Sequence, residues 1–267
     1  CRYCRGGRPT APSPAIRELS ARELIELVEL IDEVTHLHKV RLTGGEPTLH
    51  PDLSEAIKKA KALGYSSITV DTNGYLFHDI LSKVSPDDVD YFSFSLDGAT
   101  RETNDALRGE GVYDQCIAGI REAVSKGFAT SLIYTVSRAN IHELEQMPPL
   151  LKELGISRFF IQVIGIRGKS AGTREKLQLS KEEWLRIIPR AAEKAADMGI
   201  VVTYPKVFLE PKETFECAGL VADNYFIFPN GRVYRCPLCE DFPIHSLCFE
   251  REKLVQRGKI NENDLFE

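Results

Sequence analysis

Long apolar runs are missing from this sequence, and so is a strong excess of charge of either sign. No run approaches the roughly 20 apolar residues that a membrane-spanning helix needs, and no signal peptide is visible. The net charge is −5, so the basic field typical of a nucleic-acid-binding protein is missing as well. We therefore expect a cytoplasmic globular protein with neither a membrane nor a nucleic acid as its partner. The 43% of hydrophobic and 27% of charged residues agree with this class.

Cysteine is scarce too, because seven residues in 267 are too few for a small fold that disulfides hold together. Cys116 stands alone in a predicted helix, where we expect a buried apolar side chain. Two pairs have C-x-x-C spacing and no secretion signal is visible, so metal or cluster binding is favoured over disulfides. The other six cysteines lie towards the two ends of the chain: Cys1, Cys4, Cys217, Cys236, Cys239 and Cys248.

Predicted strands and helices alternate along most of the chain. Capping-box patterns begin helices at Ser20 and Ser180, and glycines such as Gly64 end them. Trp184 is expected in the core, whereas the Glu/Lys faces of residues 142–153 and 180–194 are expected to face solvent. The predicted strands are residues 39–43, 67–71, 91–95, 129–136, 158–164 and 200–203, and the predicted helices are residues 20–35, 51–63, 77–83, 113–126, 141–154 and 180 to near 199.

Alternating strands and helices with short loops predict a parallel sheet that helices cover, with right-handed crossovers. We expect an α/β fold, a partial (β/α)6 TIM-like barrel, over residues 1–204. Five barrel strands are visible up to Ile164, so the first strand would be missing from the chain and would precede Cys1. The chain also begins without Met, and we expect that sequence before Cys1 is absent here.

The pattern changes after residue 204, and residues 205–267 are predicted to form a small C-terminal α+β cluster-binding domain. Residues 224–228 and 232–236 flank Asn230-Gly231, a dipeptide typical of hairpin turns. The cysteines of the C-terminal half gather around this predicted hairpin.

Glycine-rich and polar motifs follow the predicted barrel strands. G-G-E-P spans Gly44–Pro47, T-N-G spans Thr72–Gly74, and S-L-D-G spans Ser95–Gly98. Function collects at the carboxyl ends of parallel barrel strands, and the loop with Cys1 and Cys4 would share that rim. Because glycines let a ligand approach the main chain closely, we predict a ligand site on this rim.

The motifs resemble those of the radical S-adenosylmethionine (SAM) enzymes. Cys1-Arg2-Tyr3-Cys4 is similar to the last two cysteines and the aromatic residue of that family's C-x-x-x-C-x-x-C loop, whose first cysteine would lie before this chain. Three further motifs resemble the family at the ends of its second, third and fourth strands. They are L-T-G-G-E-P-T-L-H-P-D-L (Leu42–Leu53), D-T-N-G-Y-L, and F-S-F-S-L-D-G-A-T with the following N-D-A-L-R (Asn104–Arg108). The resemblance covers residues 1–204, the predicted radical SAM core barrel.

The resemblance implies a 4Fe–4S cluster held by three cysteine thiolates, with SAM chelated to its open iron. Reduction would cleave SAM to a 5′-deoxyadenosyl radical, which abstracts a hydrogen atom from the substrate. The residue types alone leave open that Ser95 and Asp97 cap the next segment and that Arg108 is a solvated charge. The resemblance places cluster ligands at Cys1 and Cys4. It places SAM contacts at Gly44, Gly45 and Glu46 (amino group), at the adjoining Pro47, at Ser95 and Asp97 (ribose), at Arg108 (carboxylate), and at Tyr3 and the main chain near Val163 (adenine).

The C-terminal cysteines resemble the opening of the SPASM and Twitch auxiliary-cluster domains. Thirteen residues separate Cys217 from Gly231 and four separate Gly231 from Cys236, as in those domains. With Cys239 and Cys248, they would form a four-cysteine site for an auxiliary 4Fe–4S cluster. Zinc stays an alternative, because four thiolates suit tetrahedral Zn²⁺ equally well.

We therefore expect a radical SAM enzyme that works in peptide or protein maturation or in cofactor biosynthesis. Its partners would be a peptide or small-molecule substrate and an electron donor such as flavodoxin or ferredoxin. Two alternatives stay open. One is a relative of the GTP cyclase of molybdopterin biosynthesis, whose C-terminal diarginine-type tail is not visible here. The other is a non-catalytic iron–sulfur or zinc-binding protein, against which G-G-E-P and Tyr3 argue.

Overall fold

The computed structural model describes residues 39–165 and 177–210 without a break. Shorter described stretches are residues 22–23, 25–26, 28–29, 212–214, 225–227, 232–234, 247–250 and 253–256. Contacts divide the chain into two compact units, residues 1–8 with 38–208 and residues 9–37 with 209–267. Each unit has a sheet of its own.

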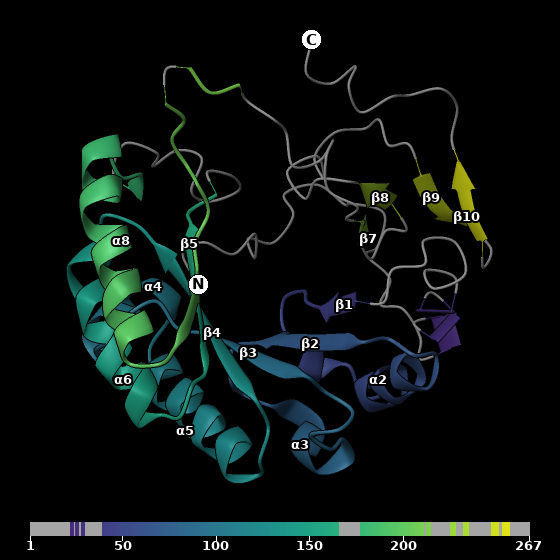
Figure 1. The fold of residues 1–267 in the computed structure, drawn as a ribbon. Coiled ribbons are helices and arrows are strands. Elements are labelled where there is room, and N and C mark those ends of the chain that lie inside the picture. Colours follow the sequence, from purple (N-terminus) through teal and green to yellow (C-terminus); the bar gives the residue numbers. More distant parts are fainter. Residues whose placement is uncertain are drawn as a thin grey trace. The chain divides into compact units, whose positions relative to one another are not determined.

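The first unit contains a parallel sheet whose six strands follow the order of the chain. Leu42 lies opposite Val70, and Val70 lies opposite Phe92, so neighbouring strands pair in a continuous register. The sheet curves, and the helices lie on its outer side (Figure 1), which confirms the α/β fold of a partial TIM-like barrel. The strands are β1 (Lys39–Leu42), β2 (Ser67–Thr72), β3 (Tyr91–Ser95), β4 (Thr130–Val136), β5 (Arg158–Val163) and β6 (Val201–Thr203).

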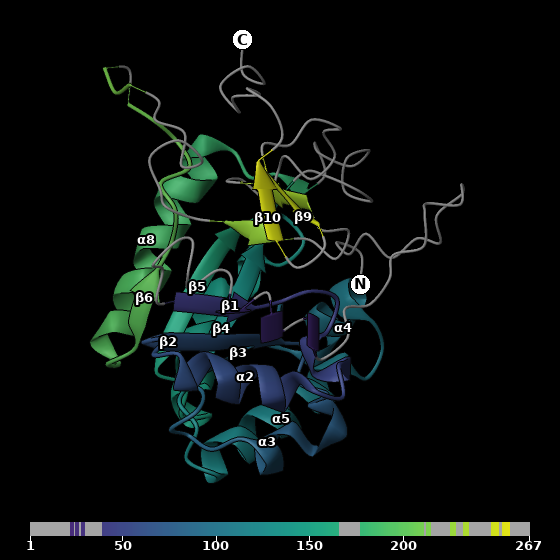
Figure 2. The same cartoon turned by 90° about the vertical axis from the view of Figure 1, so that its right-hand side faces the viewer.

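Helices connect these strands and cover the convex face of the sheet (Figures 1 and 2). Alternate strand residues such as Val70, Phe92 and Leu132 are fully buried. A shift of one residue in register would turn such side chains to the other face, so their burial fixes the pairing. The helices are η1 (Pro47–Leu49), α2 (Leu53–Ala62), η2 (Phe77–Asp79), α3 (Ile80–Lys83), α4 (Arg101–Arg108), α5 (Val112–Ser125), η3 (Ile141–Gln146), α6 (Met147–Glu153) and α8 (Lys181–Asp197).

The predicted strands agree with β1 to β6 to within one residue at each end. Cys116 and Trp184 are buried, with exposed fractions of 0% and 3%, as predicted. Among the described residues, no helix has the length and apolar character needed to cross a membrane.

Helix α4 is an element of the first unit that the apolar pattern does not predict. Asn104 and Leu107 are its only buried residues, so the helical repeat of apolar side chains is nearly absent. Thr100 caps the helix, because its hydroxyl accepts a hydrogen bond from the main-chain N–H of Thr103. A cap and the surrounding structure thus make a helix where periodicity gives little signal.

The helix predicted over residues 141–154 consists of two elements, the 3-10 helix η3 and then α6. Proline in the first turn of α6 fits the boundary, because Pro148 and Pro149 lack the N–H groups that a continuous helix would use. The prediction that the Glu/Lys face of residues 142–153 faces solvent is wrong at Glu143, which is 5% exposed. This carboxylate is buried because donors from another loop surround it.

The second unit contains an antiparallel sheet in the order β10-β9-β8-β7. Strands β7 (Phe226–Ile227) and β8 (Arg232–Tyr234) pair antiparallel, as the predicted hairpin requires. Strands β9 (Leu247–Glu250) and β10 (Lys253–Gln256) were not expected from the sequence. The described residues between 22 and 29 are helical, in agreement with the helix predicted over residues 20–35.

Candidate cofactor-binding site at the carboxyl edge of the sheet

The G-G-E-P loop follows β1 and is held by the carboxylate of Glu46, which is 9% exposed. Its Oε1 accepts hydrogen bonds from the hydroxyls of Thr48 at 2.6 Å and Thr72 at 2.9 Å, and from the main-chain N–H of Thr48 at 3.2 Å. Its Oε2 accepts one from the main-chain N–H of Asn73 at 2.7 Å. Glu46 therefore ties the loop after β1 to the loop after β2. Since a carboxylate oxygen has two lone pairs, Oε2 can take one more donor.

Gly44 and Gly45 leave open space beside the main chain. Beyond their chain neighbours, no described heavy atom lies within 4 Å of the position that a Cβ would occupy at either residue. Gly44 also has a φ of +155°, which residues with a side chain rarely adopt. Open main chain next to the spare lone pair of Glu46 suits an ammonium group, so these residues fit the predicted contact with the amino group of SAM.

Asp97 and Arg108 form a buried ion pair beyond the end of β3. Asp97 is fully buried and the Arg108 side chain is 14% exposed, so the alternative that Arg108 is a solvated charge is wrong. Nε of Arg108 lies 2.8 Å from Oδ2 of Asp97, but the two atoms are not aligned as a hydrogen bond. The guanidinium is planar, and its N–H groups suit a bidentate bond to a carboxylate, so in this respect Arg108 fits the carboxylate of SAM.

A polar network fixes Asp97 from three directions. Its Oδ1 accepts a hydrogen bond from the main-chain N–H of Thr135 at 2.7 Å, and its own N–H donates to Oδ1 of Asn104 at 3.0 Å. Nδ2 of Asn140 donates to the main-chain oxygens of Asp97 at 3.0 Å and Thr135 at 2.9 Å. A Cβ on Gly98 would stand 2.5 Å from the main-chain nitrogen of Asn104, so glycine is required there. The Asp97 carboxylate thus accepts the N–H of Thr135 near the end of β4 and pairs with Arg108. It does not cap the next helix, α4, whose cap is Thr100.

Glu143 lies behind this network and holds the start of α4. Its carboxylate accepts hydrogen bonds from the N–H groups of Ala99 at 2.7 Å and Thr100 at 3.1 Å. It also accepts from the hydroxyls of Thr100 and Thr103, each at 2.7 Å. Burial by itself would raise the pKa of Glu143, but these bonds outweigh it and lower the pKa below its usual value. The carboxylate is therefore ionised near neutral pH.

The concave face of the sheet, away from the helices, carries charged side chains. Nη1 of Arg41 lies 3.3 and 3.4 Å from the two carboxylate oxygens of Asp71. Burial raises the pKa of Asp71, against the lowering effects of Arg41 and of a hydrogen bond from Ser93. The Arg158 guanidinium lies 4.2 Å from the centre of the Tyr91 ring. Half of the Arg41 side chain is exposed, so its positive charge remains accessible on this face.

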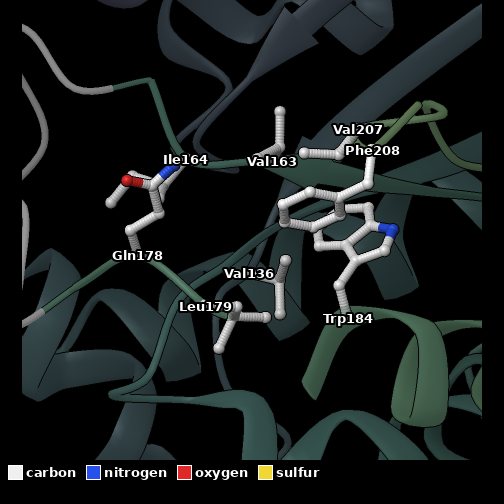
Figure 3. Close-up of a pocket in the computed structure, with 8 residues that line it drawn as sticks. All are labelled: Val136, Val163, Ile164, Gln178, Leu179, Trp184, Val207 and Phe208. Atoms are coloured by element: carbon white, nitrogen blue, oxygen red, sulfur yellow. The ribbon is translucent and has the colours of Figure 1, made fainter. Parts of the chain in front are cut away.

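Val163 ends β5 beside an apolar hollow (Figure 3). Its neighbours there include Val136 on β4, Trp184 on α8 and Phe208. Gln178 is the single polar residue of the lining. Apolar surroundings of this kind suit a flat ring, but the predicted adenine contact near Val163 remains a prediction.

The remaining predicted site residues are placed unevenly. Ser95 ends β3 half-buried, and Pro47 begins η1 directly after Glu46. Cys248 lies in β9, and its side chain is not among those described. Burial raises the pKa of the Cys116 thiol to about 12, which agrees with its predicted role as a buried apolar residue. Six predicted ligand or contact residues lie outside the described residues: Cys1, Tyr3, Cys4, Cys217, Cys236 and Cys239.

Sequence reasoning missed four residues that the structure brings to this site. Asn104 begins N-D-A-L-R, which resembles the family's motif, but no role was predicted for it. Glu143 lies in a segment expected to be solvated helix, and no sequence signal distinguishes it from a surface residue. Arg41 and Asp71 do carry a signal, because both alternate with apolar residues in predicted strands and must share a face. A parallel barrel strand with a charge at such a position has that charge in the barrel interior.

Sequence comparison finds the Radical SAM superfamily over residues 1–151. A protein of Saccharolobus solfataricus named as a probable GTP 3′,8-cyclase is 32% identical over 246 residues, which cover 86% of this chain and 77% of that protein. A protein of the same name from Metallosphaera sedula is 34% identical over 138 residues, which cover 51% of this chain and 44% of that protein.

Solved structures with a similar fold include Streptococcus suis SuiB bound to S-adenosylmethionine, with a TM-score of 0.70. The alignment covers 91% of this chain and 58% of SuiB at 15% sequence identity. The structure of anSMEcpe with bound AdoMet has a TM-score of 0.64 at 14% identity, over 88% of this chain and 67% of that one. At such identities the likeness extends to the fold alone.

Proposed function

The chain belongs to the radical SAM superfamily, and we propose that it is an enzyme that abstracts a hydrogen atom from an anionic small molecule on the concave face of its sheet. The observation that carries this proposal is the arrangement of the rim beside that face. Open glycines and Glu46 on one side and Arg108 on the other offer complementary groups for the amino and carboxylate ends of SAM.

The bound 4Fe–4S cluster and SAM would supply the 5′-deoxyadenosyl radical, and the protein supplies binding and orientation. Glu46 keeps the loops after β1 and β2 together, which holds the Gly44–Gly45 main chain open. Arg108 presents positive charge from a mostly buried site, where a carboxylate contact is stronger than in water. We expect flavodoxin or ferredoxin to deliver the electron.

The charges of the concave face favour an anionic substrate. Lys39, Arg41 and Arg158 are exposed residues of β1 and β5, and Arg41 is set by Asp71. The names of the curated relatives specify GTP, whose phosphates need such cations. We therefore place GTP or a related nucleoside triphosphate first, in a step of cofactor biosynthesis, and peptide maturation second. This reverses the order expected from the sequence alone.

Peptide maturation remains the second candidate because of the C-terminal cysteines. The spacing from Cys217 through Gly231 to Cys236 resembles SPASM and Twitch domains, and the antiparallel pairing of β7 with β8 supports a hairpin between those cysteines. An auxiliary 4Fe–4S cluster bound there is part of this proposal. Zinc in its place would leave the barrel chemistry unchanged and would show in the metal content.

The test is anaerobic reconstitution with iron and sulfide, followed by dithionite and SAM, and measurement of 5′-deoxyadenosine with and without GTP. We expect formation that GTP stimulates and that Cys4→Ala abolishes. Arg41→Ala should raise the KM for GTP about tenfold, a loss typical of one charge-assisted contact. Arg121→Ala is the matched control, because Arg121 is exposed on the outer helix α5.

Three results would decide between the two candidate functions and between a cluster and zinc at the C-terminal cysteines. No 5′-deoxyadenosine above the Cys4→Ala background would contradict the radical mechanism. If GTP does not change the formation of 5′-deoxyadenosine, but a peptide whose gene lies next to the gene of this protein increases it, peptide maturation would be favoured. About eight irons per chain would indicate two four-iron clusters, whereas about four irons with zinc would indicate a zinc site.

A further inference from the structure

Glu143 makes more hydrogen bonds to the first turn of α4 than that turn makes for itself. Within the turn, the Thr100 hydroxyl accepts the N–H of Thr103 at 3.4 Å, which is a long hydrogen bond, and the Thr100 main-chain oxygen accepts the N–H of Asn104 at 3.1 Å. The Glu143 carboxylate adds four bonds to Ala99, Thr100 and Thr103, of which three are 2.7 Å long. Ionised acceptors make the stronger hydrogen bonds, so Glu143 is the main attachment of this turn.

Helix α4 contacts Asp97 twice, one turn further along. Asn104 accepts the main-chain N–H of Asp97, and Arg108 pairs with its carboxylate. These two residues are four apart, so they lie on one face of the helix. A helix of eight residues moves as a rigid rod, so a tilt or rotation at Thr100 displaces Arg108.

We propose that Glu143 is a positioning residue, which fixes the first turn of α4 and thereby sets where Arg108 presents its guanidinium to the carboxylate of SAM. The inference rests on the proposed function for its ligand, but its structural part concerns only residues of this chain. The segment after β4 thus controls a group that lies after β3.

The experiment compares Glu143→Gln with Glu183→Gln in the reconstituted protein. Glu183 also holds a helix start by its carboxylate, since it accepts the N–H of Ser180 at 2.8 Å in the capping box of α8. That helix supplies no predicted contact to the amino or carboxylate group of SAM. Gln keeps the shape of Glu143 but has one acceptor oxygen for four donors.

Hydrogen exchange of α4 and the dissociation constant for SAM are measured for both variants. For Glu143→Gln we expect α4 amides to exchange at least about tenfold faster and SAM to bind about tenfold more weakly, which is one lost charge-assisted bond. Glu183→Gln should lower the melting temperature without either change. The KM for SAM should rise in Glu143→Gln while kcat stays within about twofold.

If Glu143→Gln exchanges faster at α4 but binds SAM like the wild type, Glu143 is merely structural and the inference is overturned. Unchanged exchange overturns it as well. If the wild type binds no SAM, the proposed function fails, and the exchange result alone decides whether Glu143 fixes α4. Should Glu143→Gln not fold, Thr103→Val removes a single donor to the same carboxylate, and a smaller loss of SAM affinity is then expected.

Discussion

The two sides of the sheet edge use carboxylates in opposite ways. After β1 and β2, Glu46 is bound by neutral donors, two hydroxyls and two main-chain N–H groups. After β3 and β4, Asp97 faces a cation, Arg108, across 2.8 Å without an aligned hydrogen bond. A carboxylate that four neutral donors hold in place has little reason to move when a ligand arrives. A charge pair must redistribute its contacts when an anionic group approaches the cation.

The difference indicates a division of work along the rim. The Glu46 side is a fixed frame that leaves glycine main chain open. On the Asp97 side, Asn104 and Asn140 form hydrogen bonds with Asp97, and Glu143 accepts one from Ala99. Arg108 is held by its ion pair with Asp97, without an aligned hydrogen bond between Nε and Oδ2. Substitutions on the two sides should therefore differ in cost and in how that cost depends on pH.

The largest effect is expected for Asp97→Ala. It leaves Arg108 buried without its counter-charge and the N–H of Thr135 without an acceptor, which should cost about 3–5 kcal/mol of unfolding free energy. Urea denaturation measures this directly. Asp97→Asn is the control, because it keeps an acceptor for Thr135 and should lose less. A loss below about 1 kcal/mol in the alanine variant would mean that Arg108 reaches solvent.

A smaller effect is expected for Glu46→Ala on the other side of the rim. It leaves the N–H of Asn73 and the hydroxyls of Thr48 and Thr72 without their acceptor, but no charge unpaired, so about 2 kcal/mol should be lost. The same urea titration compares the two sides. Equal losses for Asp97→Ala and Glu46→Ala would remove the distinction between a neutral clamp and a charge pair.

The smallest effect is a pH dependence of opposite sign at two carboxylates. The pKa of Glu143 is lowered from 4.5, so its stabilisation is complete above pH 4.5 and is lost as the pH falls through the folded-state pKa. The pKa of Asp71 is raised from 3.8, so its ionised form opposes folding once the pH rises above 3.8. The difference in stability between wild type and Glu143→Gln should therefore shrink in acid. The stability of Asp71→Asn relative to wild type should increase as the pH rises.

Thermal melts from pH 3 to pH 7 compare the three proteins. Parallel curves for wild type and both variants would mean that neither carboxylate changes its pKa on folding. Curves that diverge in the same direction would contradict the assigned cause at one of the two sites.

The strands and the rim motifs could be predicted because their signals are local. Apolar residues of β2 to β5 are bounded by glycine-containing turns, and G-G-E-P and S-L-D-G stand directly at strand ends. The position of the Glu46 side chain follows from neighbours near in space but 26 residues distant in sequence, such as Thr72. Its presence was therefore predictable and its bonding was not.

Helix α4 and the burial of Glu143 could not be predicted from the sequence, because they depend on a contact between distant segments. Thr100 and Thr103 meet Glu143 across 43 and 40 residues, and this contact makes both the polar helix and the buried acid favourable. In the sequence, α4 is a polar segment and Glu143 belongs to a charged face, and both patterns are typical of solvent-exposed structure. Only the parallel order of β3 and β4 brings the two segments together.

The buried thiol of Cys116 makes the cysteine content of this protein experimentally separable. Burial raises the pKa of this thiol to about 12, so its reactive thiolate form is scarce at pH 8 and alkylating reagents will leave it unmodified in the folded state. Any thiol that iodoacetamide labels rapidly in the native, chelator-treated protein must then come from the other six cysteines. Mass spectrometry of that sample counts the accessible cysteines that are candidate cluster ligands. Cys116 serves as the internal control, because it should stay unlabelled in the folded protein and become labelled after unfolding.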